Sequence, residues 1–131
     1  MKPPGRKAWL AEVPWLLVEY QNAALCEAKN AHHGPTSDGY EKARNLWENE
    51  RIKEMSLFAV VEMCRVCHRM APFTNYNGNT FAAIARVLIS RLGMPETQAA
   101  VVRSLAGHIV AGVASEKEVA EFREFCDGEL F

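Results

Sequence analysis

The stretch from residue 55 to residue 71 constrains the fold most, because it is apolar around most of a helix. At about 100° per residue, one face collects residues on both sides of Cys64: Leu57, Val60, Val61, Cys67, His68 and Ala71. Only Glu62, Arg65 and Arg69 form a polar stripe. A helix that is apolar over so much of its circumference is buried on several sides. We therefore expect a buried central helix at about 55–71.

The remaining chain shows helical patterns, and no stretch alternates with a period of two. Helices are predicted at 14–30, 38–70, 80–92, 95–113 and 115–128, and the polar run 48–54 suggests a kink or an exposed segment in the second. Asp38 with Glu41, and Ser115 with Glu118, have the spacing of capping boxes. The first helix is expected to turn four residues towards the core: Leu17, Val18, Leu25 and Ala28.

These patterns predict an all-α fold, a compact single-domain helical bundle of five or six helices around the 55–71 helix. Residues 1–8 are expected to be a flexible lead, and 9–131 a single helical domain. A chain of 131 residues suits one domain and buries enough surface to need no disulfide or metal.

Charge and hydropathy exclude some classes of partner. The net charge is -1, so the chain lacks the excess of basic residues that a protein uses to bind nucleic acid or an anionic membrane with its whole surface. Glu12 and Pro14 interrupt the apolar part of the N-terminus, and no window approaches the roughly 18 apolar residues of a membrane span. We therefore expect a cytoplasmic protein without membrane contact. Its four cysteines, Cys26, Cys64, Cys67 and Cys126, are then expected to be thiols.

The central stretch also contains Cys64-x-x-Cys67-His68, which spells a covalent haem site or half of a zinc site. Haem attachment normally follows export, and a structural zinc site usually takes a second pair of ligands from a separate segment. We expect both cysteines to be core residues, with no cofactor or metal. A zinc or haem protein using Cys64, Cys67 and His68 remains an alternative. The adjacent His32 and His33 are interpreted as part of a polar loop.

Residues 84–105 look like a helix-turn-helix, whose second helix enters the DNA major groove. One helix ends at Leu92-Gly93 and another starts at Pro95. The base-reading candidates would be Thr97, Gln98 and Arg103. The pattern departs from a helix-turn-helix at Ile89, where a small residue usually allows the two helices to approach. A DNA-binding regulator is one alternative for this segment, and an ordinary helical hairpin is the other.

No known catalytic motif is present, so the chain is predicted to be a non-enzymatic protein. The leading hypothesis is a subunit or inhibitor that binds a protein or nucleoprotein partner stoichiometrically. Trp9, Trp15 and Trp47 are candidate interface anchors, although core packing would explain them equally well. The mildly basic stretch 79–114 offers three candidates for a negatively charged partner: Arg86, Arg91 and Arg103. The sequence also leaves homo-oligomer formation open.

The chain resembles the small helical subunits of CRISPR effector complexes in length and in its all-helical pattern. Like them, it has a proline, Pro72, then Asn77-Gly78 and an apolar helix at 81–88. The resemblance is short and assigns no role to any residue. It implies that the expected partner could be a nucleic-acid-handling complex of this type.

Overall fold

The computed structural model describes residues 4–128, which form six α-helices and no β-strand. The helices are α1 (Trp15–Ala28), α2 (Tyr40–Glu50), α3 (Leu57–Met70), α4 (Asn77–Ser90), α5 (Glu96–Ala111) and α6 (Glu116–Asp127). The predicted all-α bundle is confirmed. Within the described residues, no helix has the length and apolar character needed to cross a membrane.

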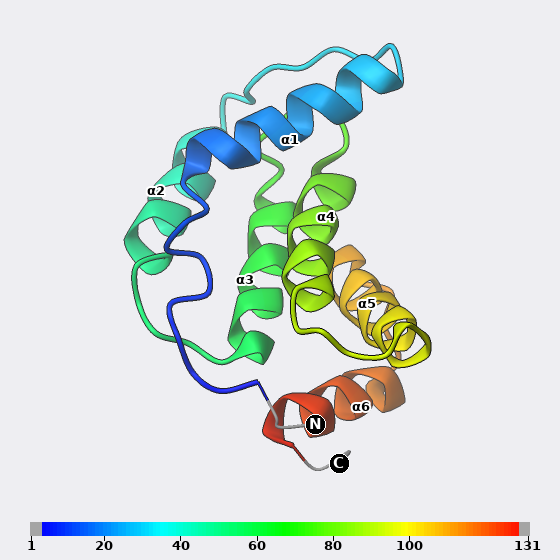
Figure 1. The fold of residues 1–131 in the computed structure, drawn as a ribbon. Helices are drawn as coiled ribbons and strands as arrows, with labels where there is room; N and C mark the ends of the chain where they lie inside the picture. Colours follow the sequence, from blue (N-terminus) through cyan, green and yellow to red (C-terminus); the bar gives the residue numbers. More distant parts are fainter. Residues whose placement is uncertain (1–3, 129–131) are drawn as a thin grey trace.

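Helix α3 lies at the centre of the bundle, as its sequence predicts. It packs against α2, α4, α5 and α6, while α1 lies across one end of the α3–α4 pair (Figure 1). Five of its side chains are fully buried: Leu57, Val60, Val61, Cys64 and Cys67. Val66 remains partly exposed, and Ala71 ends the helix in the left-handed conformation, at φ 48°.

The predicted helix from 38 to 70 is divided into two helices, close to the polar run 48–54 that suggested a kink or an exposed segment. Helix α2 ends at Glu50, and α3 begins only at Leu57, where the Ser56 hydroxyl accepts the backbone N–H of Ala59 at 3.1 Å. Met55 exchanges two backbone hydrogen bonds with Lys7, at 3.1 and 2.9 Å. This pairing holds Met55 in an extended conformation and ties the described part of the expected flexible lead to the bundle. Residues 1–3 lie outside the described part of the chain.

Only one of the two expected capping boxes forms. Ser115 and Glu118 make both reciprocal hydrogen bonds at the start of α6. At α2 the cap is Gly39 rather than Asp38, and no side chain caps the helix. The backbone N–H of Gly39 instead donates to Thr36 Oγ1 at 3.3 Å, because the preceding turn places that hydroxyl next to it.

The buried face of α1 differs from the predicted one. Its buried residues are Trp15, Val18, Asn22 and Cys26, whereas Leu17 and Ala28 are exposed. Asn22 is fully buried because its amide nitrogen donates to Asn75 O (2.8 Å) and Thr80 Oγ1 (3.0 Å). A polar residue thus joins α1 to the α3–α4 connection and to the first turn of α4.

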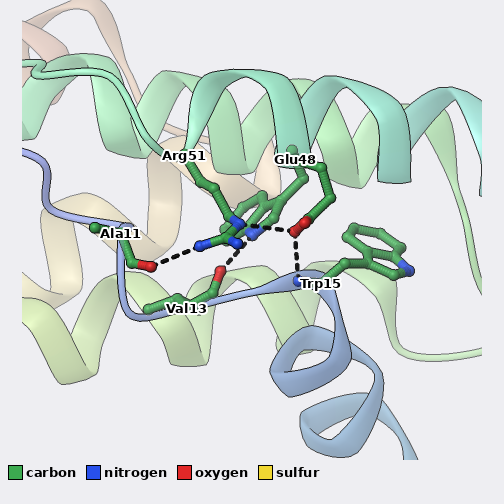
Figure 2. A network of polar contacts seen from close by, with 6 residues as sticks. Ala11, Val13, Trp15, Glu48 and Arg51 are labelled. Atoms are coloured by element: carbon green, nitrogen blue, oxygen red, sulfur yellow. Dashed lines mark hydrogen bonds and ion pairs between the residues drawn. The ribbon is translucent and has the colours of Figure 1, made fainter.

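A polar network attaches the start of α1 to α2 (Figure 2). Glu48 Oε2 accepts hydrogen bonds from the backbone N–H of Trp15 and from Arg51 Nε, both at 2.8 Å. Trp47 Nε1 donates to Val13 O at 2.8 Å. These contacts fix the angle at which the chain enters α1.

Candidate functional site

The structure separates the thiols of the Cys64-x-x-Cys67-His68 motif from its imidazole. Both thiols are fully buried in the core, and burial raises the pKa of Cys64 and raises that of Cys67 to about 12. A thiol with such a pKa stays protonated at neutral pH and is a poor metal ligand or nucleophile. His68 lies at the edge of the bundle, with Nδ1 2.8 Å from Val110 O. Within residues 4–128, no group of three or more His, Cys, Asp or Glu side chains is placed to hold a metal.

The two adjacent histidines hold the loop that precedes α2. His33 Nδ1 lies 2.7 Å from Asn22 Oδ1, and its ring packs against Phe73. The backbone carbonyl of His32 accepts hydrogen bonds from Thr74 Oγ1 (3.0 Å) and Asn75 Nδ2 (2.9 Å). Both residues therefore connect this loop to the rest of the bundle.

All three tryptophans predicted as interface anchors are buried. Trp15 packs against Trp47, Tyr40, Phe73 and Phe81 within one aromatic cluster. The three tryptophan rings therefore pack in the core, as the alternative interpretation of these residues predicts.

The three arginines of the basic stretch lie in three different places. Arg103 forms an ion pair with Glu96 and donates to Ser90 Oγ at 3.2 Å. Arg86 lines a cavity between α3, α4 and α5, whereas Arg91 lines a groove beside α1. The basic stretch therefore does not form a single positive patch.

The α4–α5 pair forms an antiparallel contact over at least one helical turn. Arg86 of α4 lies against Gly107 of α5, and Arg103 of α5 donates to Ser90 of α4. Later residues of α4 therefore contact earlier residues of α5, so the two helices run in opposite directions. Antiparallel contact along two consecutive helices is typical of a helical hairpin, one of the two alternatives for residues 84–105.

The three DNA-reading candidates do not share one environment. Thr97 is exposed, Gln98 is half-buried, and the Arg103 guanidinium is already engaged by a carboxylate of its own helix. Arg103 is the one cation among these three residues, and it is paired with Glu96.

A groove between α1 and α4 is a feature that the sequence analysis does not predict. Three large apolar side chains line it while remaining substantially exposed: Leu17 (45%), Tyr20 (61%) and Val87 (48%). The groove has a volume of about 330 Å³ and adjoins a second hollow of about 280 Å³. The two share four lining residues: Glu12, Val13, Leu88 and Arg91.

A signal for this groove was present in the sequence. Helix α1 carries large apolar residues on more than one face, with Leu16 and Leu17 beside Trp15 and Val18. A helix that packs along one face only must leave some of these side chains in solvent. The sequence pattern groups Leu17 with Val18 on one side of the helix, whereas in the structure Leu17 lines the groove and Val18 is buried.

The groove changes from apolar to charged along its length. Tyr20, Leu17 and Val87 lie at one end, whereas the adjoining hollow is lined by Lys7 and Arg91 together with Glu12. Lys7 Nζ lies 4.1 Å from the centre of the Trp9 ring. Neither Lys7 nor Arg91 forms an ion pair within residues 4–128, so this end carries two unpaired positive charges and one negative charge, a net charge of about +1.

No protein-family model, curated protein or solved structure matches this chain. The function is therefore inferred from its own residues.

Proposed function

We propose that the protein acts by stoichiometric binding, without catalysis of its own, and that a partner protein docks in the α1–α4 groove. The observation that carries this proposal is the exposure of Leu17, Tyr20 and Val87 around one hollow. Single exposed apolar residues are common, but a group of them rimmed by charges is typical of interaction surfaces. Tyrosine in particular combines a large contact area with few rotatable bonds.

The occupant is an apolar segment with an acidic end. A groove between two helices suits the apolar face of an amphipathic helix. The uncompensated charges of Lys7 and Arg91 favour a carboxylate at the end of the segment that reaches them. Such a segment can belong to a free protein or to the protein part of a nucleoprotein complex.

A cytoplasmic location is part of the same proposal. All four cysteines are free and buried, and Cys64 and Cys67 lie one turn apart on α3 without forming a disulfide. Unpaired thiols suit a reducing compartment. Fractionation of cells that produce the protein tests this location.

Site-directed photo-crosslinking tests the docking groove. Benzoylphenylalanine replaces Tyr20 or Val87 in cells that naturally produce the protein, and Val113 serves as the control. Val113 is also an exposed apolar residue, at 70%, but it lies in the α5–α6 connection. We expect the groove positions to crosslink to one protein that the control position does not reach, and mass spectrometry then identifies the attached segment.

A charge swap decides whether this crosslinked protein is the proposed partner. Arg91→Glu should weaken binding of the purified partner, and replacing the partner's acidic residue by lysine should restore it. Equal crosslinking from Val113, or a segment without an acidic residue, would sink the proposal. A crosslink to a second copy of this chain would show self-association instead.

A further inference from the structure

A second groove lies between α2 and α3, beside the connection that joins these two helices. It has a volume of about 330 Å³, and it shares no lining residue with the α1–α4 groove or with the hollow that adjoins it. Its described lining residues are either apolar or charged. The apolar ones are Leu46, Met55, Ala59, Met63 and Val66. We call this feature the α2–α3 groove.

The α3 side of this groove is an apolar stripe that reaches solvent. Ala59, Met63 and Val66 recur at helical spacing, so they lie on one face of α3 over a length of about 10 Å. Val66 is 41% exposed, and it is the one large apolar side chain of α3 that is exposed in the described chain. The apolar surface of the central helix therefore remains uncovered at this stripe, above all at Val66.

The connection that forms another wall of the groove is held in place by the N-terminal segment. Met55 exchanges two backbone hydrogen bonds with Lys7, at 3.1 and 2.9 Å. Arg6 Nη2 donates to the backbone carbonyl of Glu54 at 3.2 Å. A wall that is fixed beforehand loses little conformational freedom when a partner binds. The flexible side chains of Met55 and Met63 can still adjust to the shape of that partner.

The charged lining residues give the α2–α3 groove a negative sign. They are Glu50, Lys53, Glu54 and Glu62. Lys53 is the one cation among them and pairs with Glu50, whereas Glu54 and Glu62 form no ion pair within residues 4–128. Exposed carboxylates do not by themselves mark a site, but they decide the charge of what the apolar stripe can bind. They attract lysine and arginine side chains and repel the phosphates of nucleic acids and anionic lipids.

We propose that a basic amphipathic helix of a partner protein docks in the α2–α3 groove. Apolar residues at positions i, i+3 or i+4 and i+7 of such a helix match the length of the stripe. Lysine or arginine residues that flank them face Glu54 and Glu62. The charge of this segment is opposite to that of the segment proposed for the α1–α4 groove. The two grooves have no lining residue in common, so this proposal does not depend on the other.

Amide chemical shifts of the whole chain, measured by NMR during titration with synthetic peptides, test this site. The first peptide is an amphipathic helix of leucine and lysine, about 15 residues long. One analogue has glutamate in place of lysine, and the other has the same residues in an order that forms no apolar face. We expect the leucine–lysine peptide to shift the amides of Leu46, Ala59 and Val66, and to bind more weakly at high salt. Both analogues should leave these three amides unchanged.

Paired substitutions show whether the charge of the groove itself is responsible. Glu54→Gln combined with Glu62→Gln should weaken binding of the leucine–lysine peptide about three- to tenfold. The control combines Glu27→Gln with Asp38→Asn, which removes the same charge from two exposed residues that do not line the α2–α3 groove. It should weaken binding much less. The spectrum of each free variant shows that it is folded before its binding is compared.

Three results would overturn the proposal. These are the absence of shifts at the three amides with millimolar leucine–lysine peptide, equal shifts with either analogue, and equal losses in the two double variants. Shifts of the same amides that depend on protein concentration alone would also overturn it, because they would assign the groove to a second copy of the chain. The glutamate analogue tests the α1–α4 groove separately, and a failure to shift Leu17, Tyr20 and Val87 would count against that groove alone.

Discussion

Glu48 Oε2 accepts the backbone N–H of Trp15 at 2.8 Å, so a carboxylate of α2 caps α1 from outside that helix (Figure 2). Helix α1 has no side-chain cap of its own at Pro14, and its first turn contains no acidic residue. The N-terminal N–H groups of a helix need acceptors, and a negative charge there interacts favourably with the helix dipole. Glu48 meets both needs and also binds Arg51.

Replacing Glu48 by alanine should therefore lower the free energy of unfolding by about 1–2 kcal/mol. The change leaves the Trp15 N–H and the Arg51 guanidinium without this acceptor. The control is Glu41→Ala in the first turn of the same helix, which removes an exposed charge and an exposed ion pair with Arg44 at 3.9 Å and should cost less than about 1 kcal/mol. Urea denaturation of both variants measures the difference, and equal stabilities would contradict the capping role.

Replacing Gly39 by alanine should be much more destabilising, by about 3 kcal/mol or more. An added Cβ would stand 1.8 Å from the Met70 carbonyl oxygen, and a backbone atom cannot move aside as the end of a side chain can. The α2 cap must therefore separate from the end of α3. Gly5→Ala is the control, because nothing lies within 4 Å of its added Cβ. A Gly39→Ala protein with the thermal midpoint of Gly5→Ala would refute the close approach.

The buried thiols should make stability fall at alkaline pH. Burial raises the pKa of Cys67 from 9.0 to about 12, and it raises the pKa of Cys64 as well. A raised pKa in the folded state means that the contribution to stability is complete below 9.0 and is lost as the pH rises towards about 12. The free energy of unfolding should therefore be lower near pH 10 than at neutral pH, as measured by urea denaturation at both.

A Cys67→Val variant provides the control for this pH dependence, because it removes one of the titrating thiols at a buried position. Its loss of stability between the two pH values should be smaller than that of the unchanged protein. At neutral pH, iodoacetamide should label Cys64 and Cys67 slowly in the folded chain and rapidly in urea, as followed by mass spectrometry. Equally rapid labelling in both states would show that the thiols are accessible.

The Glu118 carboxyl should titrate below its ordinary pKa of 4.5. The hydrogen bond with His108 lowers its pKa most, and the backbone N–H of Ser115 lowers it further. A lowered pKa in the folded state means that the contribution to stability is present above 4.5 and is lost as the pH falls through the folded value. Carboxyl NMR titration measures this pKa, and His108→Gln should raise it. An unchanged titration in that variant would assign the shift to the cap alone.

Much of the fold was predictable because local pattern and burial agree. The apolar circumference of 57–67 indicates a helix in contact with several others, and the structure places α3 at the centre. The Ser115–Glu118 spacing sets the start of α6 in the same way, since both cap partners lie within one turn. Pattern alone also favoured the core position of Cys64 over a cofactor site.

The break between α2 and α3 and the buried face of α1 depend on contacts between distant segments. Lys7 pairs with Met55, and Asn22 is buried because Asn75 and Thr80 accept its hydrogen bonds from across the bundle. The placement of the candidate binding residues likewise depends on contacts between distant segments. The sequence shows that Arg86 and Arg91 lie in a basic stretch, but only the packing of α4 places one over Gly107 and the other beside α1.

The sequence by itself thus determined the all-helical class and the central helix, because helical periodicity and capping act within a few residues. Only the tertiary structure decided where the helices break, which apolar side chains remain in solvent and which charges remain unpaired. These properties depend on the relative placement of segments that are tens of residues apart, which no local pattern encodes.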